Sequence, residues 1–383
     1  MLTKLSIFIE NVNWVPRILV RTVKRPMSTE RDVILETKGN KGVIILNRPK
    51  AMNSLTLSMM RKVSSQLKSW DWDPAVKMVI IKGFGGHAFC AGGDMRTFVH
   101  AYKDGNLKLV EDTCREAYQL VNLIDTLKTP YVALIDGITM GMGVGITVHG
   151  TYRICTEGTV CATPEVAIGF FPDGSASYFL PKLPGKMGVF LALTGHRLLG
   201  YDVLKAGIAT HYVDKTKLSY LETALLGLPN PSLADIDRTI LKVSQQGETD
   251  PKKDSALSLA WKKINIMFEA DSVESIMDAL RTEGSDWSRK QLGVLNKMSP
   301  TSLKVTFEAL KRGANMDLQN CLKMDYRIAL KLVKTSDLYE GVKKVLIDKN
   351  NKPVWKPATL KEVTEDIVNS YFEQFPFDKE LML

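Results

Sequence analysis

Two glycine-rich stretches constrain the fold of this chain most strongly, because each follows an apolar run of strand length and precedes a helical pattern. They read "FCAGGD" (residues 89–94) and "GITMGMGVG" (residues 137–145). Runs of glycine remove side chains and expose backbone N–H groups at a helix N-terminus. One such turn is suited to a phosphate. Two turns from different parts of the chain can converge on a single oxygen atom, which is how an oxyanion hole for an acyl group is built.

A dinucleotide site is the competing interpretation, because "GMGVG" partly matches the pattern G-x-G-x-x-G. The actual spacing is G-x-G-x-G, and the acidic residue that should follow about 20 positions later is represented only by Glu157, at a shorter interval. A packing role for the glycines would explain one stretch but not both. The sequence therefore favours an acyl-group site.

A third stretch, "PEVAIGFFPD" (residues 164–173), places Glu165 and Asp173 at the two ends of an apolar run. Burying an unpaired carboxylate is costly, so such a pair needs either hydrogen-bonding partners or a chemical task. Apolar surroundings are also expected to raise the pKa of at least one of the two acids. We interpret them as working carboxylates, with two acids on an exposed turn as the alternative.

Composition narrows the class of protein and its partners. The 383 residues, 45% hydrophobic and 24% charged, are sufficient for a large globular domain and a smaller one. No run approaches the roughly 18 to 20 apolar residues of a membrane span, so no membrane partner is expected. The five cysteines show no C-x-x-C pairing, which indicates reduced thiols and no metal site. The net charge of +9 comes without a basic stripe interleaved with aromatics, so an anionic small ligand is expected rather than nucleic acid.

The N-terminal segment, residues 1–32, has its own charge pattern. Its first 29 residues contain five basic residues and one acidic residue, interspersed with hydrophobic ones. This pattern resembles a cleavable mitochondrial presequence, and a disordered basic tail is the alternative. The first interpretation predicts a location in the mitochondrial matrix.

The chain then divides by its periodicity into an α/β part and a helical part. We expect a β-hairpin within 31–49, a helix capped by Thr56 that runs to about residue 70, and a recurring strand, strand, helix unit. After residue 195 amphipathic helices follow one another to about residue 373. The stretch "GLPNP" (residues 227–231) is the expected junction. The predicted division is therefore a catalytic domain at 33–228 and a helical domain at 229–383.

Several motifs together resemble the crotonase (enoyl-CoA hydratase/isomerase) superfamily. The stretches "LNRPKAMNSLT", "HAFCAGGDM", "YVALIDGITMGMGVG" and "ATPEVAIGFFPD" have its order and spacing. The later "MSPTSLKVTFEAL" and "MDYRIA" resemble its thioester-hydrolysing branch. The resemblance covers about residues 33–373 and implies a crotonase-like spiral of strand-strand-helix units with a C-terminal helical region.

The same resemblance implies hydrolysis of a β-hydroxyacyl-CoA thioester. Coenzyme A is then part of the substrate, and no separate cofactor is expected. Two alternatives remain: an enoyl-CoA hydratase or isomerase, and a catalytically weak CoA-binding protein. Assembly into a homo-oligomer is implied as well, although the helical tail can instead fold back on its own subunit.

Roles for individual residues follow from the resemblance. The catalytic acids would be Glu165 and Asp173, and the backbone N–H groups of Gly93 and Met142 would form the oxyanion hole. Glu165 would either attack the thioester carbonyl or activate a water molecule, and the sequence leaves both routes open. The other implied contacts are substrate-binding residues Glu116, Ala117, Asp94 and Gly141, and CoA-binding residues Met52, Asn53, Leu55, His87, Ala88, Phe89 and Lys50.

The chain departs from the family pattern near the acyl end of the expected site. Met142 replaces a glycine, and Ala117 stands where the hydrolases carry a substrate-contacting glutamate, with Glu116 one position away. Gly145 stands where hydratases keep a second catalytic glutamate, so hydration would lack one of its two acid/base groups. Cys90, close to the first glycine turn, is expected to be a packing residue. These departures leave the identity of the acyl group open.

Overall fold

The computed structural model describes residues 31–244, 256–348 and 352–383. Residues Asp32–Leu383 form one compact unit. The presequence predicted for residues 1–32 lies almost entirely outside the described residues, so it stays a prediction.

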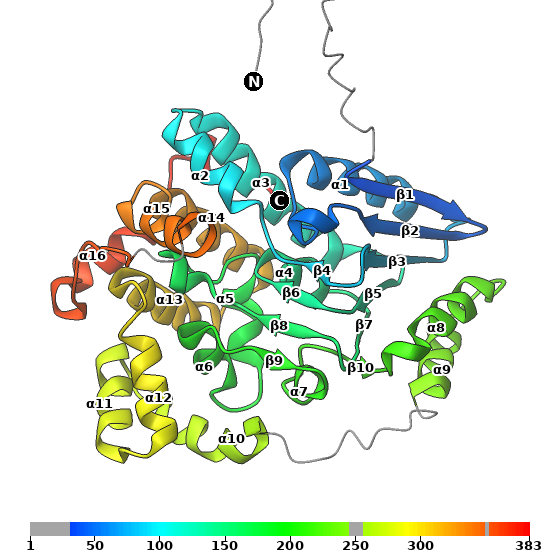
Figure 1. Cartoon of the computed structure of the whole chain (residues 1–383). Helices are drawn as coiled ribbons and strands as arrows, with labels where there is room; N and C mark the ends of the chain where they lie inside the picture. Colours follow the sequence, from blue (N-terminus) through cyan, green and yellow to red (C-terminus); the bar gives the residue numbers. More distant parts are fainter. Residues whose placement is uncertain (1–30, 245–255, 349–351) are drawn as a thin grey trace, which may run out of the picture. The chain divides into compact units, whose positions relative to one another are not determined.

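A six-stranded sheet runs through this unit in the order β1-β2-β3-β5-β7-β10 (Figure 1). β1 and β2 pair antiparallel with Lys38 opposite Lys41, which confirms the predicted hairpin, and the remaining neighbours are parallel. The strands are β1 (Val33–Lys38), β2 (Lys41–Leu46), β3 (Met78–Gly83), β5 (Tyr131–Ile135), β7 (Tyr152–Cys155) and β10 (His211–Tyr212).

A second sheet has four short strands in the order β4-β6-β8-β9. These strands are β4 (Ala88–Cys90), β6 (Ile138–Met140), β8 (Val160–Ala162) and β9 (Leu198–Leu199). Successive strands enter the two sheets alternately: β3 is followed by β4, β5 by β6, and β7 by β8, with helices after each pair. This alternation is the recurring strand-strand-helix unit that the sequence predicts.

Helices fill the rest of the unit. Thr56 begins the first one as predicted, because its side chain accepts a hydrogen bond from the Met59 N–H at 3.2 Å. The helices are α1 (Leu57–Trp72), α2 (Met95–Lys103), α3 (Leu107–Thr126), α4 (Met142–Val148), α5 (Ala176–Phe179), α6 (Met187–Thr194), α7 (Tyr201–Lys205), α8 (Lys215–Gly227), α9 (Leu233–Ser244), α10 (Ala256–Met267), α11 (Val273–Glu283), α12 (Asp286–Leu295), α13 (Pro300–Gly313), α14 (Leu318–Leu332), α15 (Ser336–Val342) and α16 (Glu365–Ser370).

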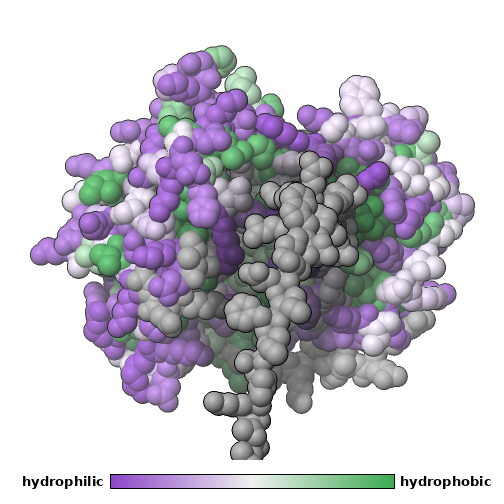
Figure 2. All heavy atoms as spheres, turned by 45° about the horizontal axis from the view of Figure 1, so that its top comes forward, coloured by the Kyte–Doolittle hydropathy of each residue, from purple (hydrophilic) through white to green (hydrophobic). Residues whose placement is uncertain are grey.

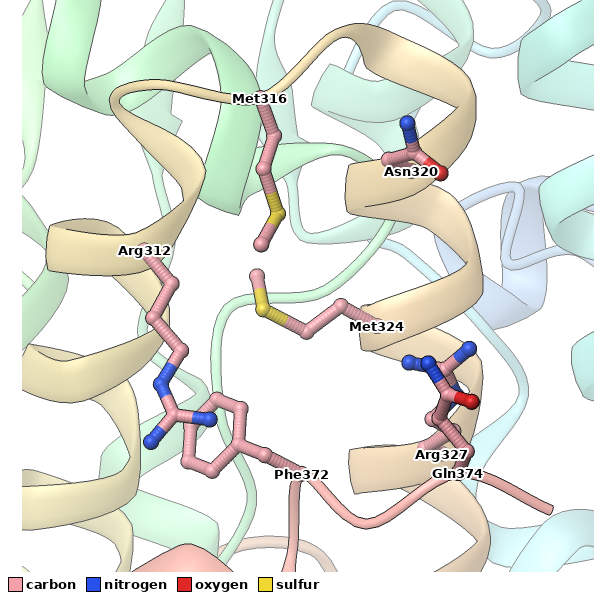
Figure 3. A pocket seen from close by; sticks show the side chains of 7 residues that line it. All are labelled: Arg312, Met316, Asn320, Met324, Arg327, Phe372 and Gln374. Carbon is pink, nitrogen blue, oxygen red and sulfur yellow. The ribbon is translucent and has the colours of Figure 1, made fainter.

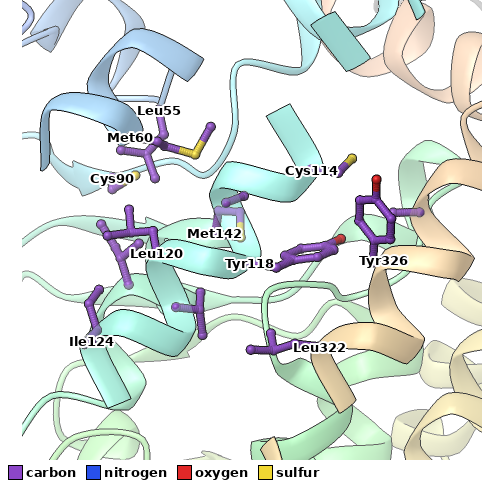
Figure 4. Close-up of a cluster of buried hydrophobic side chains, with 14 of the residues drawn as sticks. Leu55, Met60, Cys90, Cys114, Tyr118, Leu120, Ile124, Met142, Leu322 and Tyr326 are labelled. Atoms are coloured by element: carbon purple, nitrogen blue, oxygen red, sulfur yellow. The ribbon is translucent and has the colours of Figure 1, made fainter. Parts of the chain in front are cut away.

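The C-terminal helices share their hydrophobic core with the N-terminal part. One buried cluster contains Leu55 and Tyr118 together with Leu322 and Tyr326 (Figure 4). α14 packs against α3, and α13 packs against α5 and α6. The two parts of the chain therefore share buried residues across the predicted boundary at 228/229, and that boundary remains a prediction from the sequence.

Hydrophilic side chains dominate the face shown in Figure 2, with hydrophobic residues scattered among them. Among the described residues, no helix is both long and apolar enough to cross a membrane.

Candidate active site

Three neighbouring parallel strands bring the candidate site together. β6 lies between β4 and β8, with Cys90 opposite Thr139 and Met140 opposite Ala162. The carboxyl ends of adjacent parallel strands meet at one edge of a sheet, so the segments that follow them lie side by side. Those segments are the turn at 91–93, the turn at 141–142, and the short 3-10 helix Glu165–Ile168.

Close backbone contacts confirm that the two glycine turns meet. A Cβ atom placed on Gly92 would lie 3.0 Å from the Met140 carbonyl oxygen and 3.6 Å from the Met142 nitrogen. A Cβ atom on Gly141 would lie only 2.4 Å from Oε1 of Glu165. The Glu165 carboxyl group therefore lies directly against the second turn, and glycine at 141 leaves it room.

Two backbone donors at this junction have no acceptor among the residues that the structure describes. Gly93 lies opposite Leu55, and the residues on either side of it make the hydrogen bonds. The Leu55 N–H donates to the Gly92 carbonyl group at 2.8 Å, and the Asp94 N–H donates to the Leu55 carbonyl group at 2.9 Å. Met142 is the first residue of α4, where an N–H has no intrahelical acceptor. Among the described residues, no hydrogen bond uses the Gly93 or Met142 N–H. Both donors are available to a ligand oxygen.

Glu165 is a buried carboxyl group beside these donors. Glu165 is 8% exposed, and within the described part of the chain its Oε2 atom has no hydrogen-bond partner. Burial, and then the charge of Asp173, raise the pKa of Glu165 well above its usual value. A carboxyl group with a raised pKa is suited to general acid/base chemistry.

Asp173 lies on the turn that follows the same 3-10 helix. The Tyr118 hydroxyl group, from α3, donates to its Oδ2 at 3.0 Å. Burial raises the pKa of Asp173 to about 6, and the Tyr118 hydrogen bond opposes this increase. The sulfur of Met142 also reaches this turn, since a Cβ atom on Gly174 would lie 2.5 Å from it. Met142 and Tyr118 belong to the same buried cluster (Figure 4).

The turn after Asp173 also occupies the space beside Gly145. A Cβ atom on Gly145 would lie 2.8 Å from the Gly174 carbonyl oxygen and 3.5 Å from the Gly174 Cα. A glutamate at position 145 could be accommodated only if the backbone at Gly174 shifted. The structure therefore disfavours an acid/base pair of the hydratase type.

The four predicted substrate-binding residues lie in different surroundings. Gly141 borders Glu165, as described above. Asp94 is the N-cap of α2 and forms an ion pair with Arg48 at 2.9 Å. Glu116 forms an ion pair with the half-exposed Arg61 at 2.8 Å, whereas Ala117 is buried. Glu116 lies two positions from Tyr118 on α3, so it faces away from Asp173, and the structure gives no support for its predicted substrate contact.

The predicted CoA-binding residues fall into two groups. Asn53 is fully buried, and its side chain donates to the carbonyl groups of Phe84 and Ala88 at 2.9 and 2.8 Å, so it braces two loops. Leu55, Ala88 and Phe89 are buried as well, which leaves them only backbone groups to offer a ligand. The exposed members of the predicted set are Met52, Lys50 and His87.

Neither Cys90 nor a metal-ligand cluster forms a competing site in the described part of the chain. Burial raises the pKa of Cys90 to about 12, consistent with its predicted packing role. No cluster of histidine, cysteine and acidic side chains there could hold a metal ion. A pocket of about 350 Å³ lies between α13, α14 and the segment at 372–374 (Figure 3), and the two arginines that line it are paired with glutamates.

Two residues near Asp173 were missed by sequence reasoning. Tyr118 binds Asp173 directly, and Asp325 of α14 is a fully buried carboxyl group that binds the turn after Asp173. "MDYRIA" was noted only as a family-like stretch. A buried polar position on an otherwise apolar helix face is the signal that could have singled out Asp325.

This fold and site define a class of enzyme that acts on the acyl groups of coenzyme A thioesters. The Enoyl-CoA hydratase/isomerase family model matches residues 41–372, so the chain belongs to the enoyl-CoA hydratase/isomerase (crotonase) family. A carnitinyl-CoA dehydratase from Mycobacterium thermoresistibile has a similar structure, with a TM-score of 0.83 and 35% identity over 92% of this chain and 98% of that one. An enoyl-CoA hydratase from Rhodobacter sphaeroides has a TM-score of 0.82 and 29% identity over 92% and 100%. The predicted crotonase-like fold is confirmed.

The similar curated proteins are more specific in name. The mitochondrial 3-hydroxyisobutyryl-CoA hydrolase of Homo sapiens is 50% identical over 342 residues, 89% of this chain and 88% of its own length. The protein of the same name from Xenopus laevis is 51% identical over 339 residues, 88% of each chain. The one from Mus musculus is 48% identical over 357 residues, 93% of this chain and 92% of its own length. These relatives confirm the predicted thioester-hydrolase branch of the family.

Proposed function

We propose that this protein is a mitochondrial 3-hydroxyisobutyryl-CoA hydrolase of the matrix. It cleaves the thioester to the free hydroxy acid and coenzyme A, a step of valine and branched-chain amino acid degradation. One observation carries the proposal: the backbone N–H groups of Gly93 and Met142, which have no acceptor in the described part of the chain, lie at the ends of adjacent parallel strands beside the buried Glu165. The identity of the acyl group, 3-hydroxyisobutyryl, is inferred from the names of the relatives.

In the proposed mechanism the thioester carbonyl oxygen accepts hydrogen bonds from the Gly93 and Met142 N–H groups. Negative charge develops on that oxygen during attack, and each donor of this kind is worth about 2.7–4 kcal/mol of transition-state stabilisation. Both donors are backbone groups, so replacement of the usual glycine by Met142 retains the N–H.

Glu165 supplies the attacking group by one of two routes. It attacks the carbonyl carbon to form a mixed anhydride that water then hydrolyses, or it takes a proton from a water molecule that attacks directly. In both routes the C–S bond breaks and coenzyme A leaves as a thiolate that takes up a proton. In the direct route the water oxygen ends on the hydroxy acid; in the anhydride route it ends on the hydroxy acid or on Glu165, according to which carbonyl carbon the water attacks. Asp173 orients the water or the substrate hydroxyl group, or supplies the proton to the leaving thiolate.

The coenzyme A moiety is proposed to lie along the loops at 50–55 and 87–89. Lys50, Met52 and His87 are exposed there and can offer side chains, whereas the buried members can offer only backbone groups. We also propose a homo-oligomer, as in the sequence-based expectation, which light scattering of the purified protein would test.

Thiol release from 3-hydroxyisobutyryl-CoA, 3-hydroxypropionyl-CoA and crotonyl-CoA tests the proposal. We expect turnover of the hydroxyacyl thioesters and a decrease in kcat of about 10²- to 10⁴-fold in Glu165→Gln, the usual contribution of an acid/base group. Glu222→Gln is the matched control, because Glu222 forms an ion pair with Lys82 and takes no part in the site. Hydration of crotonyl-CoA without thioester cleavage would contradict the proposal.

A catalytically weak CoA-binding protein is the second candidate, and one observation favours it. Ala117 offers no polar group where the hydrolases place a substrate-contacting glutamate, and Glu116 is held by Arg61 on another face of α3. Tight binding of coenzyme A thioesters without thiol release would support this second function.

A further inference from the structure

The turn that carries Asp173 has a strained backbone. Gly174 and Ser175 both have left-handed φ angles, of 61° and 77°. Ser175 is fully buried and is not a glycine, and non-glycine residues rarely adopt this region of backbone conformation. Such a conformation persists only where the surrounding groups hold it.

Asp325, on α14, forms hydrogen bonds that stabilise this conformation. Its Oδ2 accepts a hydrogen bond from the Ser175 N–H at 3.1 Å, and the Ser177 hydroxyl group donates to its Oδ1 at 2.6 Å. Asp325 is fully buried. The two carboxyl oxygens of Asp325 therefore bind the backbone of Ser175 and the side chain of Ser177, two and four residues after Asp173.

The Ser175 side chain contacts a second element, the C-terminal end of α4. Its hydroxyl oxygen lies 2.7 Å from Nε2 of His149, and Nδ1 of His149 lies 3.1 Å from the Asp125 carboxylate. His149 is the C-cap of α4, the helix whose first residue is Met142. The turn is thus fixed between α14 and the helix that carries one of the proposed oxyanion donors.

We propose that Asp325 is a positioning residue for Asp173. By binding the Ser175 N–H and the Ser177 hydroxyl group, it fixes the strained turn that presents the Asp173 carboxyl group to the acyl site. This inference rests on the proposed hydrolase function and assigns a role to a C-terminal helix that the proposed mechanism does not use.

The charge state of Asp325 is the measurable consequence. The groups that face it are Asp173 and Ser175 on the turn, Ser177 on α5, Tyr118 on α3 and Cys321 on its own helix. Burial, together with the charge of Asp173, raises the pKa of Asp325 to about 8. Ionisation of Asp325 above this pH places a second negative charge near Asp173.

The test is the pH dependence of kcat/KM for thiol release between pH 6 and pH 10. We expect the wild-type protein to lose activity above about pH 8. Asp325→Asn keeps one acceptor and one donor but cannot ionise, so its alkaline decrease should disappear. Asp337→Asn is the matched control: Asp337 is also buried, accepting from the Ser299 hydroxyl group at 2.6 Å and the Lys356 N–H at 2.8 Å, and this variant should keep the wild-type decrease.

Ser177→Ala gives an independent measurement that does not alter the acid itself. The Ser177 hydrogen bond lowers the pKa of Asp325, so its removal should move the alkaline decrease to higher pH. An alkaline decrease that is absent from the wild-type protein, unchanged in Asp325→Asn, or unmoved in Ser177→Ala would overturn this inference alone. Absence of any thiol release by the wild-type protein would overturn the proposed function and this inference with it.

Discussion

Single residues determine how closely the reacting groups of the site approach one another. Gly141 leaves room for the Glu165 carboxyl group, and Gly145 leaves room for the backbone of the Asp173 turn. Two acids are thereby brought into one apolar environment, where the charge of Asp173 makes ionisation of Glu165 less favourable. The pH dependence of the enzyme should therefore report on both acids and on the groups that bind them.

Tyr118→Phe should move the acidic limb of the kcat/KM profile to higher pH. The Tyr118 hydrogen bond lowers the pKa of Asp173, which burial has raised to about 6. Without this bond the pKa rises further, so a higher pH is needed to ionise Asp173. Thiol release measured between pH 4.5 and pH 8 gives the midpoint of the limb.

Tyr131→Phe is the control for Tyr118→Phe. Tyr131 is also a buried tyrosine, and among the described residues its hydroxyl group has no hydrogen-bond partner. Its removal should leave the acidic limb in place. An equal shift in both variants would show that the Tyr118 hydrogen bond does not set the ionisation of Asp173.

Sequence reasoning reached some residues of the site and missed others for a physical reason. Glu165 and Asp173 were identifiable because carboxylates at the ends of an apolar run are costly to bury without a purpose. Tyr118 and Asp325 were not, because Tyr118 lies 55 residues from Asp173, and Asp325 lies 150 and 148 residues from the two serines that it binds. Their partners depend on helix packing, which periodicity along the chain does not encode.

At the scale of elements, three adjacent parallel strands form the site by ending at one edge of the second sheet. β4, β6 and β8 have only three residues each. Alternation of apolar and polar residues cannot be recognised over so short a run, so the second sheet could not be drawn from the sequence, although the glycine turns that follow two of its strands could. The hairpin and helix α1 have clear periodic patterns and could be predicted.

Close helix packing beside the site leads to an element-scale prediction. A Cβ atom on Gly313, at the end of α13, would lie 2.0 Å from the Ser177 carbonyl oxygen. Gly313→Ala should therefore push α13 away from α5 and lower the free energy of unfolding by about 1–3 kcal/mol, the usual cost of overpacking. Urea unfolding followed by circular dichroism measures this change.

Gly293→Ala, in α12, is the matched control for that variant. A Cβ atom there would have no neighbour within 4 Å, and alanine is favoured over glycine in a helix by up to about 1 kcal/mol. This variant should be neutral or stabilised. A loss of stability equal to that of Gly313→Ala would rule out overpacking against Ser177 as the cause.

At the scale of the whole molecule, the C-terminal helices complete the core that supports the site. Leu322 and Tyr326 belong to the same buried cluster as Leu55 and Tyr118. The sequence showed the change from strands to helices after residue 195 but gave no sign of this shared core, because the pattern of one helix does not identify the helix it packs against.

A fragment of residues 33–228 should therefore not fold on its own. Removal of α9 to α16 would expose the face of α3 that packs against α14, together with the turn that Asp325 binds. We expect broad, non-cooperative thermal unfolding and binding of a hydrophobic dye, in contrast to a single transition for residues 32–383. A sharp transition in the fragment would instead support an independent domain that ends near residue 228.

The last residues of the chain bind α3, the helix that carries Tyr118. Arg115 donates to the Glu380 carbonyl group at 3.0 Å, Gln119 donates to the Met382 carbonyl group at 2.8 Å, and Leu381 is fully buried between them. An affinity tag fused after Leu383 would begin two residues beyond this buried side chain. A purification handle or fluorescent fusion at this end is therefore expected to loosen the support of the helix that carries Tyr118.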